Sequence, residues 1–281
     1  MSFALRVLQW IRRGVEKEFT DLTPNRHQIK IKHYGWKPSL PRLNVPVKYD
    51  SRMVVGILPP SVDLRSLCPP VYDQGQLGSC TANAIAGAIE FDMIRQKISE
   101  FTPSRLYIYY NERDIESDIT CDCGANLADG IDAVSNLGFC PESEWPYDIT
   151  QFAIKPSPQC FADGLQNKAI SYARVANEII PSVMKLCLSE GNPFVFGFTV
   201  YESFESSEVT STGVVPMPQP TEKIIGGHAV LCVGYDDTKG VFICRNSWGS
   251  SWGQNGYFTI PYEYLTSNTL ASDFWTIKVI S

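Results

Sequence analysis

The chain has 281 residues, of which 44% are hydrophobic and 19% charged, a composition typical of a folded globular protein. That length suffices for one large hydrophobic core or two modest ones. No stretch approaches the roughly 20 consecutive apolar residues of a membrane-spanning helix, so we expect no membrane span. The first ten residues are interrupted by Arg6 and Gln9 and have no basic residue before the apolar ones, so they make a poor secretory signal.

Charge is divided unevenly along the chain. Residues 1–58 hold 11 Lys/Arg and 4 Asp/Glu, a net charge of +7, whereas residues 59–281 hold 13 and 26, a net charge of −13. Opposite fields attract, so we expect the basic leader to dock on its own acidic body. The alternative is a basic arm for nucleic acid or an anionic membrane, but Arg12-Arg13 is too short a basic run to favour it. We therefore expect no nucleic-acid partner.

The leader divides into two parts by pattern. Residues 3–19 place their apolar side chains on one helical stripe, which predicts an amphipathic helix. From about 20 to 60 the stripe ends, and six prolines impose extended backbone, namely Pro24, Pro38, Pro41, Pro46, Pro59 and Pro60. A helix followed by an extended segment suits a chain laid over another surface. A linker or a disordered tail is the alternative.

A long helix is predicted from about Ser79 to Ile98, because apolar residues recur there at helical spacing and Ser79 suits the N-cap position. Cys80 then lies in the first turn, where the helix dipole and free amide groups favour a thiolate. A small core cysteine is the alternative, and position alone does not decide. Residues 100–150 also read as helical, with one helix near 127–137.

After about residue 165 the pattern changes to short β-rich runs. The clearest hairpin joins residues 229–235 to residues 241–246. If Tyr235 faces Val241, the pairing brings His228 within a residue or two of Asn246 on the same face. The same register places Cys232 opposite Cys244, either as a disulfide or as packed thiols.

Nine cysteines leave eight if Cys80 is reactive, an even number that is compatible with disulfides or with buried free thiols. Cys121-Asp-Cys123 lacks the two-residue gap of a zinc ribbon. We expect no metal site and no cofactor.

Three residues far apart in the sequence suit nucleophilic catalysis. Cys80 supplies a thiol, His228 is the only histidine outside the leader, and the Asn246 amide oxygen can orient an imidazole. Gln74, six residues before the thiol, can join the Cys80 backbone N–H in an oxyanion hole. Trp248 can shield the His–Asn hydrogen bond from water.

These residues resemble the papain-like cysteine peptidases over most of residues 59–281. The stretch from Asn246 to Tyr257, with its two Trp-Gly pairs and closing Gly-Tyr, is the most specific part of the match. The family usually has Cys-Gly-Ser-Cys-Trp at the nucleophile, whereas this chain has Leu77-Gly-Ser-Cys-Thr81. These departures look closer to the bacterial and giant-virus branches than to animal lysosomal enzymes. Because residues 59–281 contain no second histidine, the histidine pair of cathepsin B's occluding loop cannot exist here, so removal of C-terminal dipeptides is not expected and an endopeptidase is.

The resemblance also implies which residues hold substrate. Gly124 is the candidate for backbone contact, with Ala125 as a less open neighbour. Ser272 and Asp273 fall where the family has the floor of its S2 pocket, which takes the second residue before the scissile bond, and Ala229 falls on its wall. If Asp273 faces the pocket, Arg or Lys should be accepted there; if Ser272 does, apolar residues should be preferred.

The resemblance implies an α+β, papain-like two-domain fold with an active-site cleft between the domains. We expect a pro-segment over residues 1–58, a helical left domain over 59–160 and a β-barrel-like right domain over 161–281. The pro-segment would fill the cleft, with residues 36–46 crossing it, Trp36 as an anchor, and acid as the trigger for release. Apart from that segment, the expected partner is a peptide or protein substrate, and we expect a monomer.

The predicted function is a cysteine endopeptidase that forms an acyl-thioester and is made as a self-inhibited zymogen. A Cys-His acyltransferase and a catalytically inactive peptide-binding homologue are the alternatives. We expect an intracellular or virion-associated protein, with a secreted or lysosomal-type compartment left open.

Overall fold

The computed structural model describes residues 34–40, 47–49, 56–98, 101–168, 170–176 and 181–279. The helix predicted over residues 3–19 lies outside these ranges, as does most of the segment predicted as a pro-segment. The described residues all belong to one compact unit, Lys32–Ser281. None of their helices is long and apolar enough to cross a membrane.

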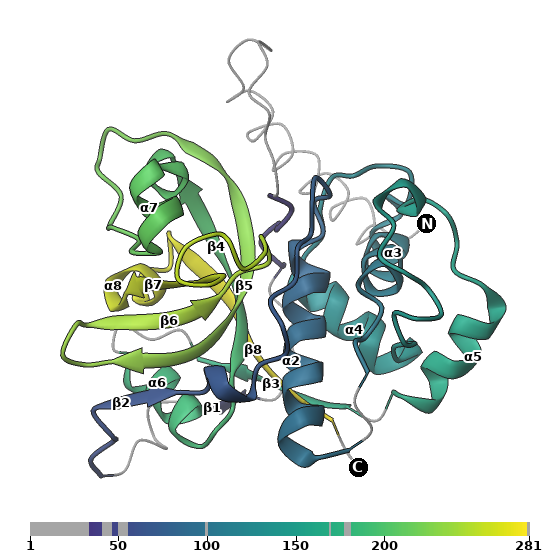
Figure 1. Cartoon of the computed structure of the whole chain (residues 1–281), viewed down its shortest axis with the longest axis horizontal. Coiled ribbons are helices and arrows are strands. Elements are labelled where there is room, and N and C mark those ends of the chain that lie inside the picture. Colours follow the sequence, from purple (N-terminus) through teal and green to yellow (C-terminus); the bar gives the residue numbers. More distant parts are fainter. Residues whose placement is uncertain are drawn as a thin grey trace, which may run out of the picture. The chain divides into compact units, whose positions relative to one another are not determined.

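The helical part of this unit follows the order of the sequence. Its helices are α2 (Cys80–Gln96), α3 (Arg105–Glu116), α4 (Leu127–Leu137), η3 (Ile149–Gln151) and α5 (Pro158–Gln166). Side-chain oxygens of Ser104, Asn126 and Ser157 accept hydrogen bonds from backbone amides in the first turns of α3, α4 and α5. Helix α2 is buried over most of its length, and Figure 1 shows it between the other helices and the sheet.

The remaining residues build one open sheet of eight strands. The strands are β1 (Val47–Tyr49), β2 (Ser61–Asp63), β3 (Ile170–Val175), β4 (Phe194–Tyr201), β5 (Ile224–Asp236), β6 (Val241–Arg245), β7 (Tyr257–Pro261) and β8 (Ala271–Val279). Their order is β1-β3-β8-β4-β5-β6-β7, with β2 paired to β5. Each pair is antiparallel except β1 with β3. The expected barrel-like sheet is therefore not closed. Four short helices connect consecutive strands: α6 (Ser182–Ser189), η4 (Glu202–Glu205), α7 (Ser207–Thr212) and α8 (Tyr262–Thr266). A fifth, η2 (Arg65–Leu67), lies between β2 and α2.

A β-bulge adjusts the hairpin of β5 and β6. Next to the turn Tyr235 faces Phe242, one residue away from the predicted partner Val241. A register shift between Cys232 and Gly234 restores the predicted pairing, so that Cys232 faces Cys244. The bulge explains why the register predicted near the turn was wrong while the pairing near the base was right.

Two hydrophobic cores lie on either side of the sheet. One joins α2, α3 and α4 to side chains from β4, β5 and β8, such as Val195, Leu231 and Trp275. The other is rich in phenylalanine and lies between the sheet and α6, α7 and α8. In the first core, the buried side chains of α2 pack against the sheet, and this packing holds the N-terminus of α2 beside β5. The predicted domain boundary after residue 160 falls inside α5, and it stays a prediction.

Candidate active site

Cys80 is the first residue of α2 and is fully buried. Ser79 occupies the N-cap position as predicted, but its side chain does not cap the helix and instead contacts the Tyr147 hydroxyl. Burial raises the pKa of the Cys80 thiol to about 12, although hydrogen bonds from the backbone amides of Ala229 and Gly35 act in the opposite direction. The effect of burial on the thiol pKa is thus larger than the effect expected from the helix N-terminus, so the thiol is neutral where the sequence had suggested a thiolate.

His228 and Asn246 meet at the base of the bulged hairpin, and both are buried. The His228 Nε2 and Asn246 Oδ1 atoms lie 2.8 Å apart. The backbone N–H of Ser247 donates to the same oxygen, also at 2.8 Å, which identifies that atom as the amide oxygen. Nε2 must therefore carry the proton, and Nδ1 is the ring nitrogen left for proton exchange. The Trp248 ring lies 4.9 Å from the imidazole, centroid to centroid, and covers this pair.

Gln74 is held next to the same motif. Its backbone N–H donates to the Ser247 carbonyl at 2.8 Å, and the Ser247 hydroxyl donates to Gln74 Oε1 at 2.6 Å. Gln74 Nε2 donates to the Leu77 carbonyl at 2.9 Å. The hydroxyl thus fixes which end of the amide is the donor, and that donor points toward the loop that leads to Cys80.

A second group supports this loop from the helical side. The Tyr147 hydroxyl donates to the Gln74 carbonyl at 3.0 Å. The Arg105 guanidinium lies 4.0 Å from the Tyr147 ring centroid and 2.7 Å from a Glu142 carboxylate oxygen. The sequence pattern does not single out Ser247, Arg105 and Tyr147 as positioning residues. Only the position of Ser247, between Asn246 and Trp248, could have suggested it.

Residues 34–39, which we call the strap, lie directly over Cys80. The strap pairs with both sides of the site: Trp36 N–H donates to the Gly227 carbonyl at 3.0 Å, and Ala125 N–H donates to the Gly35 carbonyl at 2.7 Å. A Cβ added to Gly35 would lie 1.7 Å from the Gly78 carbonyl oxygen. In Figure 1 the strap is the purple segment beside β5 and the end of α2.

Three of the candidate substrate-contact residues, Gly124, Ala125 and Asp273, contact this strap. Ala125 makes the backbone hydrogen bonds, since its carbonyl also accepts from Lys37 N–H at 2.9 Å. Gly124 permits the close approach, because it has a φ of +72° and an added Cβ would lie 1.9 Å from the Gly35 carbonyl oxygen. The Ala229 amide lies against the thiol of Cys80.

The Trp36 indole lies against Gly197 and Gly227 and is only 7% exposed. Its Nε1 donates to Asp273 Oδ2 at 3.1 Å, and the Ser39 backbone N–H donates to the same oxygen at 2.8 Å. Burial raises the pKa of the Asp273 carboxyl. Asp273 thus contacts the strap, while Ser272 pairs with Gly197 in the sheet. Which of the two faces a substrate side chain stays a prediction.

This chain is similar in sequence to a known protein family and to several of its members. The family model described as papain family cysteine protease matches residues 58–273. The chain belongs to the papain family. An uncharacterized peptidase C1-like protein of Acanthamoeba polyphaga mimivirus is 46% identical over 217 residues, which are 74% of this chain and 70% of the relative. A cathepsin B-like protein of Giardia intestinalis is 31% identical over 72% of this chain and 69% of its own.

Solved structures of the papain family agree with this assignment. Xylellain, a cysteine protease from Xylella fastidiosa, is 45% identical and matches with a TM-score of 0.83 over 92% of this chain and 100% of its own. Procathepsin L 3 of Tenebrio molitor matches with a TM-score of 0.64 over 99% of this chain and 90% of its own, and at 19% identity it shows the fold alone. This papain-family chain is thus a hydrolase, a cysteine peptidase, with relatives in a giant virus and a bacterium, as the nucleophile motif suggested.

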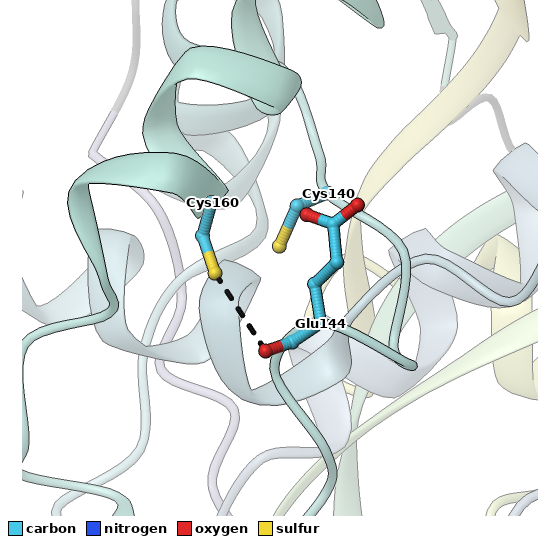
Figure 2. A group of neighbouring side chains, drawn as sticks. All are labelled: Cys140, Glu144 and Cys160. Carbon is cyan, nitrogen blue, oxygen red and sulfur yellow. Dashed lines mark hydrogen bonds between the residues drawn. The ribbon is translucent and has the colours of Figure 1, made fainter.

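Apart from Cys80, six cysteines fall into three groups. Cys121 and Cys123 form a disulfide, whereas Cys232 and Cys244 face each other as free thiols. Figure 2 shows a third group, made of Cys140, Cys160 and Glu144, in which the Cys160 thiol donates to the backbone carbonyl of Glu144 at 3.9 Å. The three ligand atoms of this group lie within 4.8 Å of one another. A structural zinc site uses four protein ligands, and this group supplies three, of which Glu144 is exposed. We assign no metal to it.

Proposed function

We propose that this papain-family chain is an endopeptidase that uses a Cys80-His228-Asn246 site and is held inactive by its own strap. The proposal is carried by the contact between Asn246 and His228. That contact leaves Nδ1 of the imidazole for the thiol, which lies against the amide of the next residue, Ala229. All the groups that the chemistry needs are present, which argues against an inactive homologue.

Each residue has a role in a two-stage reaction. His228 takes the Cys80 proton, and the sulfur adds to the peptide carbonyl carbon to give a tetrahedral oxyanion. Gln74 Nε2 and the Cys80 backbone N–H donate to that oxyanion. The C–N bond then breaks as His228 gives its proton to the departing amine, which leaves a thioester on Cys80. Water adds to this thioester while His228 takes a proton from it, and loss of the thiolate releases the acid and restores the thiol.

The direction of the strap explains how it could inhibit without being cut. Because His228 must reach the leaving amine, the part of a substrate after the scissile bond lies on the side of His228 and Trp248. Tyr34 occupies that side, since its ring centroid is 5.9 Å from each of those rings, and Trp36 occupies the opposite side. The strap therefore runs opposite to a substrate, and the backbone N–H of Gly35 lies against the sulfur.

Peptide cleavage by single variants tests this assignment. The leader must first be removed from the folded full-length chain, by self-processing or limited proteolysis, to give what we call the matured enzyme. Cys80→Ala and His228→Ala should abolish cleavage of a fluorogenic peptide. Asn246→Ala should weaken cleavage without stopping it, because Asn246 orients the imidazole and makes no bond to substrate. Retained activity in Cys80→Ala would refute the proposal, and faster transfer to an added amine than to water would indicate an acyltransferase.

A further inference from the structure

The strap reports on a part of the site that the proposed chemistry does not use. The Tyr34 ring lies over Gly226, where an added Cβ would come within 2.9 Å of it. The ring also makes edge contacts with His228 and Trp248. At its far end the Tyr34 hydroxyl donates to Glu205 Oε1 at 2.9 Å. One strap side chain thus fills a position that has an aromatic wall, a glycine floor and a carboxylate at its end.

Glu205 is accessible to a ligand. It is exposed at the end of η4, and within the described ranges it forms no ion pair. Its neighbour Phe204 is buried against Trp248 and anchors η4. The carboxylate is therefore held near the site by a packed side chain while its own partner comes from the strap. Removal of the strap would leave this acceptor facing solvent.

The position of this carboxylate decides which part of a substrate it would meet. Tyr34 lies on the side where the departing amine must pass His228. The contacts of Tyr34 at this position are made by its side chain and not by its backbone. A substrate side chain on the same side of the site can therefore enter the same pocket, although the substrate backbone runs in the opposite direction to the strap. A substrate side chain that reaches Glu205 must span the aromatic wall and end in a hydrogen-bond donor. Tyrosine, lysine and arginine satisfy both conditions.

We propose that Gly226, Trp248 and Glu205 form a subsite that selects Tyr, Lys or Arg within the first two residues after the scissile bond. The inference rests on the proposed peptidase function and names one class of its substrates. Because Glu205 is exposed and solvent screens its charge, the expected preference over a neutral aliphatic residue is modest, about fivefold in kcat/KM. A tenfold or larger preference would require a more buried contact than the structure shows.

The strap itself tests the chemistry of the subsite without any peptide cleavage. In the full-length chain, the rate at which iodoacetamide labels Cys80 measures how often the strap lifts. Tyr34→Lys should label about as slowly as the unmodified protein, because the ammonium replaces the hydroxyl as donor to Glu205. Tyr34→Glu should label several-fold faster, because two carboxylates then meet. Adding Glu205→Lys to Tyr34→Glu should restore slow labelling, and an equal effect of all three changes would overturn the subsite.

Substrate libraries test the same subsite in the matured enzyme. Peptides that vary at the first two positions after the scissile bond should show the preference for Tyr, Lys and Arg, and Glu205→Gln should flatten it. Glu208→Gln removes the same charge three residues away, from another exposed side chain, and should leave the preference intact. Cleavage with no such preference, or one that survives Glu205→Gln, refutes the subsite and leaves the peptidase assignment standing. Absence of any cleavage, with the strap variants behaving as expected, refutes the peptidase instead.

Discussion

Replacing Trp36 by alanine in the full-length chain should open the site, because this side chain is the main anchor of the strap. The indole is 7% exposed and donates its single N–H to Asp273. Truncation of a buried tryptophan typically costs about 3–5 kcal/mol. In the structure this cost falls on the contact between the strap and the body, since the indole lies against Gly197 and Gly227.

A cost of that size predicts a large change in a measurable rate. Because each 1.4 kcal/mol is a factor of ten, the strap-free fraction should rise by roughly two to three and a half orders of magnitude, until that state dominates. Labelling of Cys80 by iodoacetamide, mapped by mass spectrometry, should accelerate by the same factor. Leu40→Ala is the matched control, because Leu40 follows the strap directly but is 72% exposed and should not change the rate. If Trp36→Ala labels no faster than Leu40→Ala, the strap does not guard Cys80 and the reasoning fails.

Four further changes have expected outcomes. Gly35→Ala should also speed Cys80 labelling in the full-length chain, because its Cβ would meet the Gly78 carbonyl at 1.7 Å; an unchanged rate would mean that the strap does not approach the loop so closely. Gln74→Ala should lower kcat of the matured enzyme by about 10²- to 10³-fold, the usual effect of losing one oxyanion donor, and a change below threefold would exclude that role. Ser247→Ala should lower kcat by a smaller factor and leave KM nearly unchanged, because it removes the hydrogen bond that orients the Gln74 side-chain amide but leaves that amide in place. Burial raises the pKa of Glu112 well above its usual value, so the free energy of unfolding should fall as pH rises from about 4.3 toward that raised pKa, by up to about 1.4 kcal/mol per pH unit. Glu112→Gln should remove this decline, measured by denaturant titrations at several pH values. An unaltered dependence of stability on pH would contradict the prediction.

The sequence pattern was sufficient to predict the positions of residues whose placement depends on local structure. Apolar spacing after Ser79 placed Cys80 at a helix start, and the parity of one hairpin brought His228 to Asn246. Trp36 was expected to anchor a segment across the site, and the structure places it there. Each of these placements depends only on the period of one element or on the register of two.

The remaining features depend on how distant segments pack. Ser247, Arg105 and Tyr147 hold the Gln74 loop through contacts between residues far apart in sequence, which no periodicity reveals. Asp273 could not be separated from Ser272 because its orientation depends on a left-handed backbone, with a φ of +60°, and on a register shift in the pairing of β4 with β8.

The expected release of the strap by acid also rested on a general rule about paired carboxylates. That rule needs a pKa lowered in the closed state, whereas burial raises the pKa of Asp273, the carboxyl that holds Trp36 and Ser39. A group with a raised pKa binds its proton more tightly in the closed state. Protonation between its usual pKa, near 4, and the raised value therefore favours closure through this contact. Acid release, if it occurs, must act through other groups.

The measurement that most directly tests the central claim is a titration of the matured enzyme with iodoacetamide, in which peptide cleavage and labelling are followed together. The assignment predicts that activity falls in proportion to one label per chain, that peptide mapping finds this label on Cys80, and that a bound peptide substrate slows both events equally. A label on any other cysteine that abolishes cleavage, or full activity after complete labelling of Cys80, would contradict the claim that this thiol is the nucleophile.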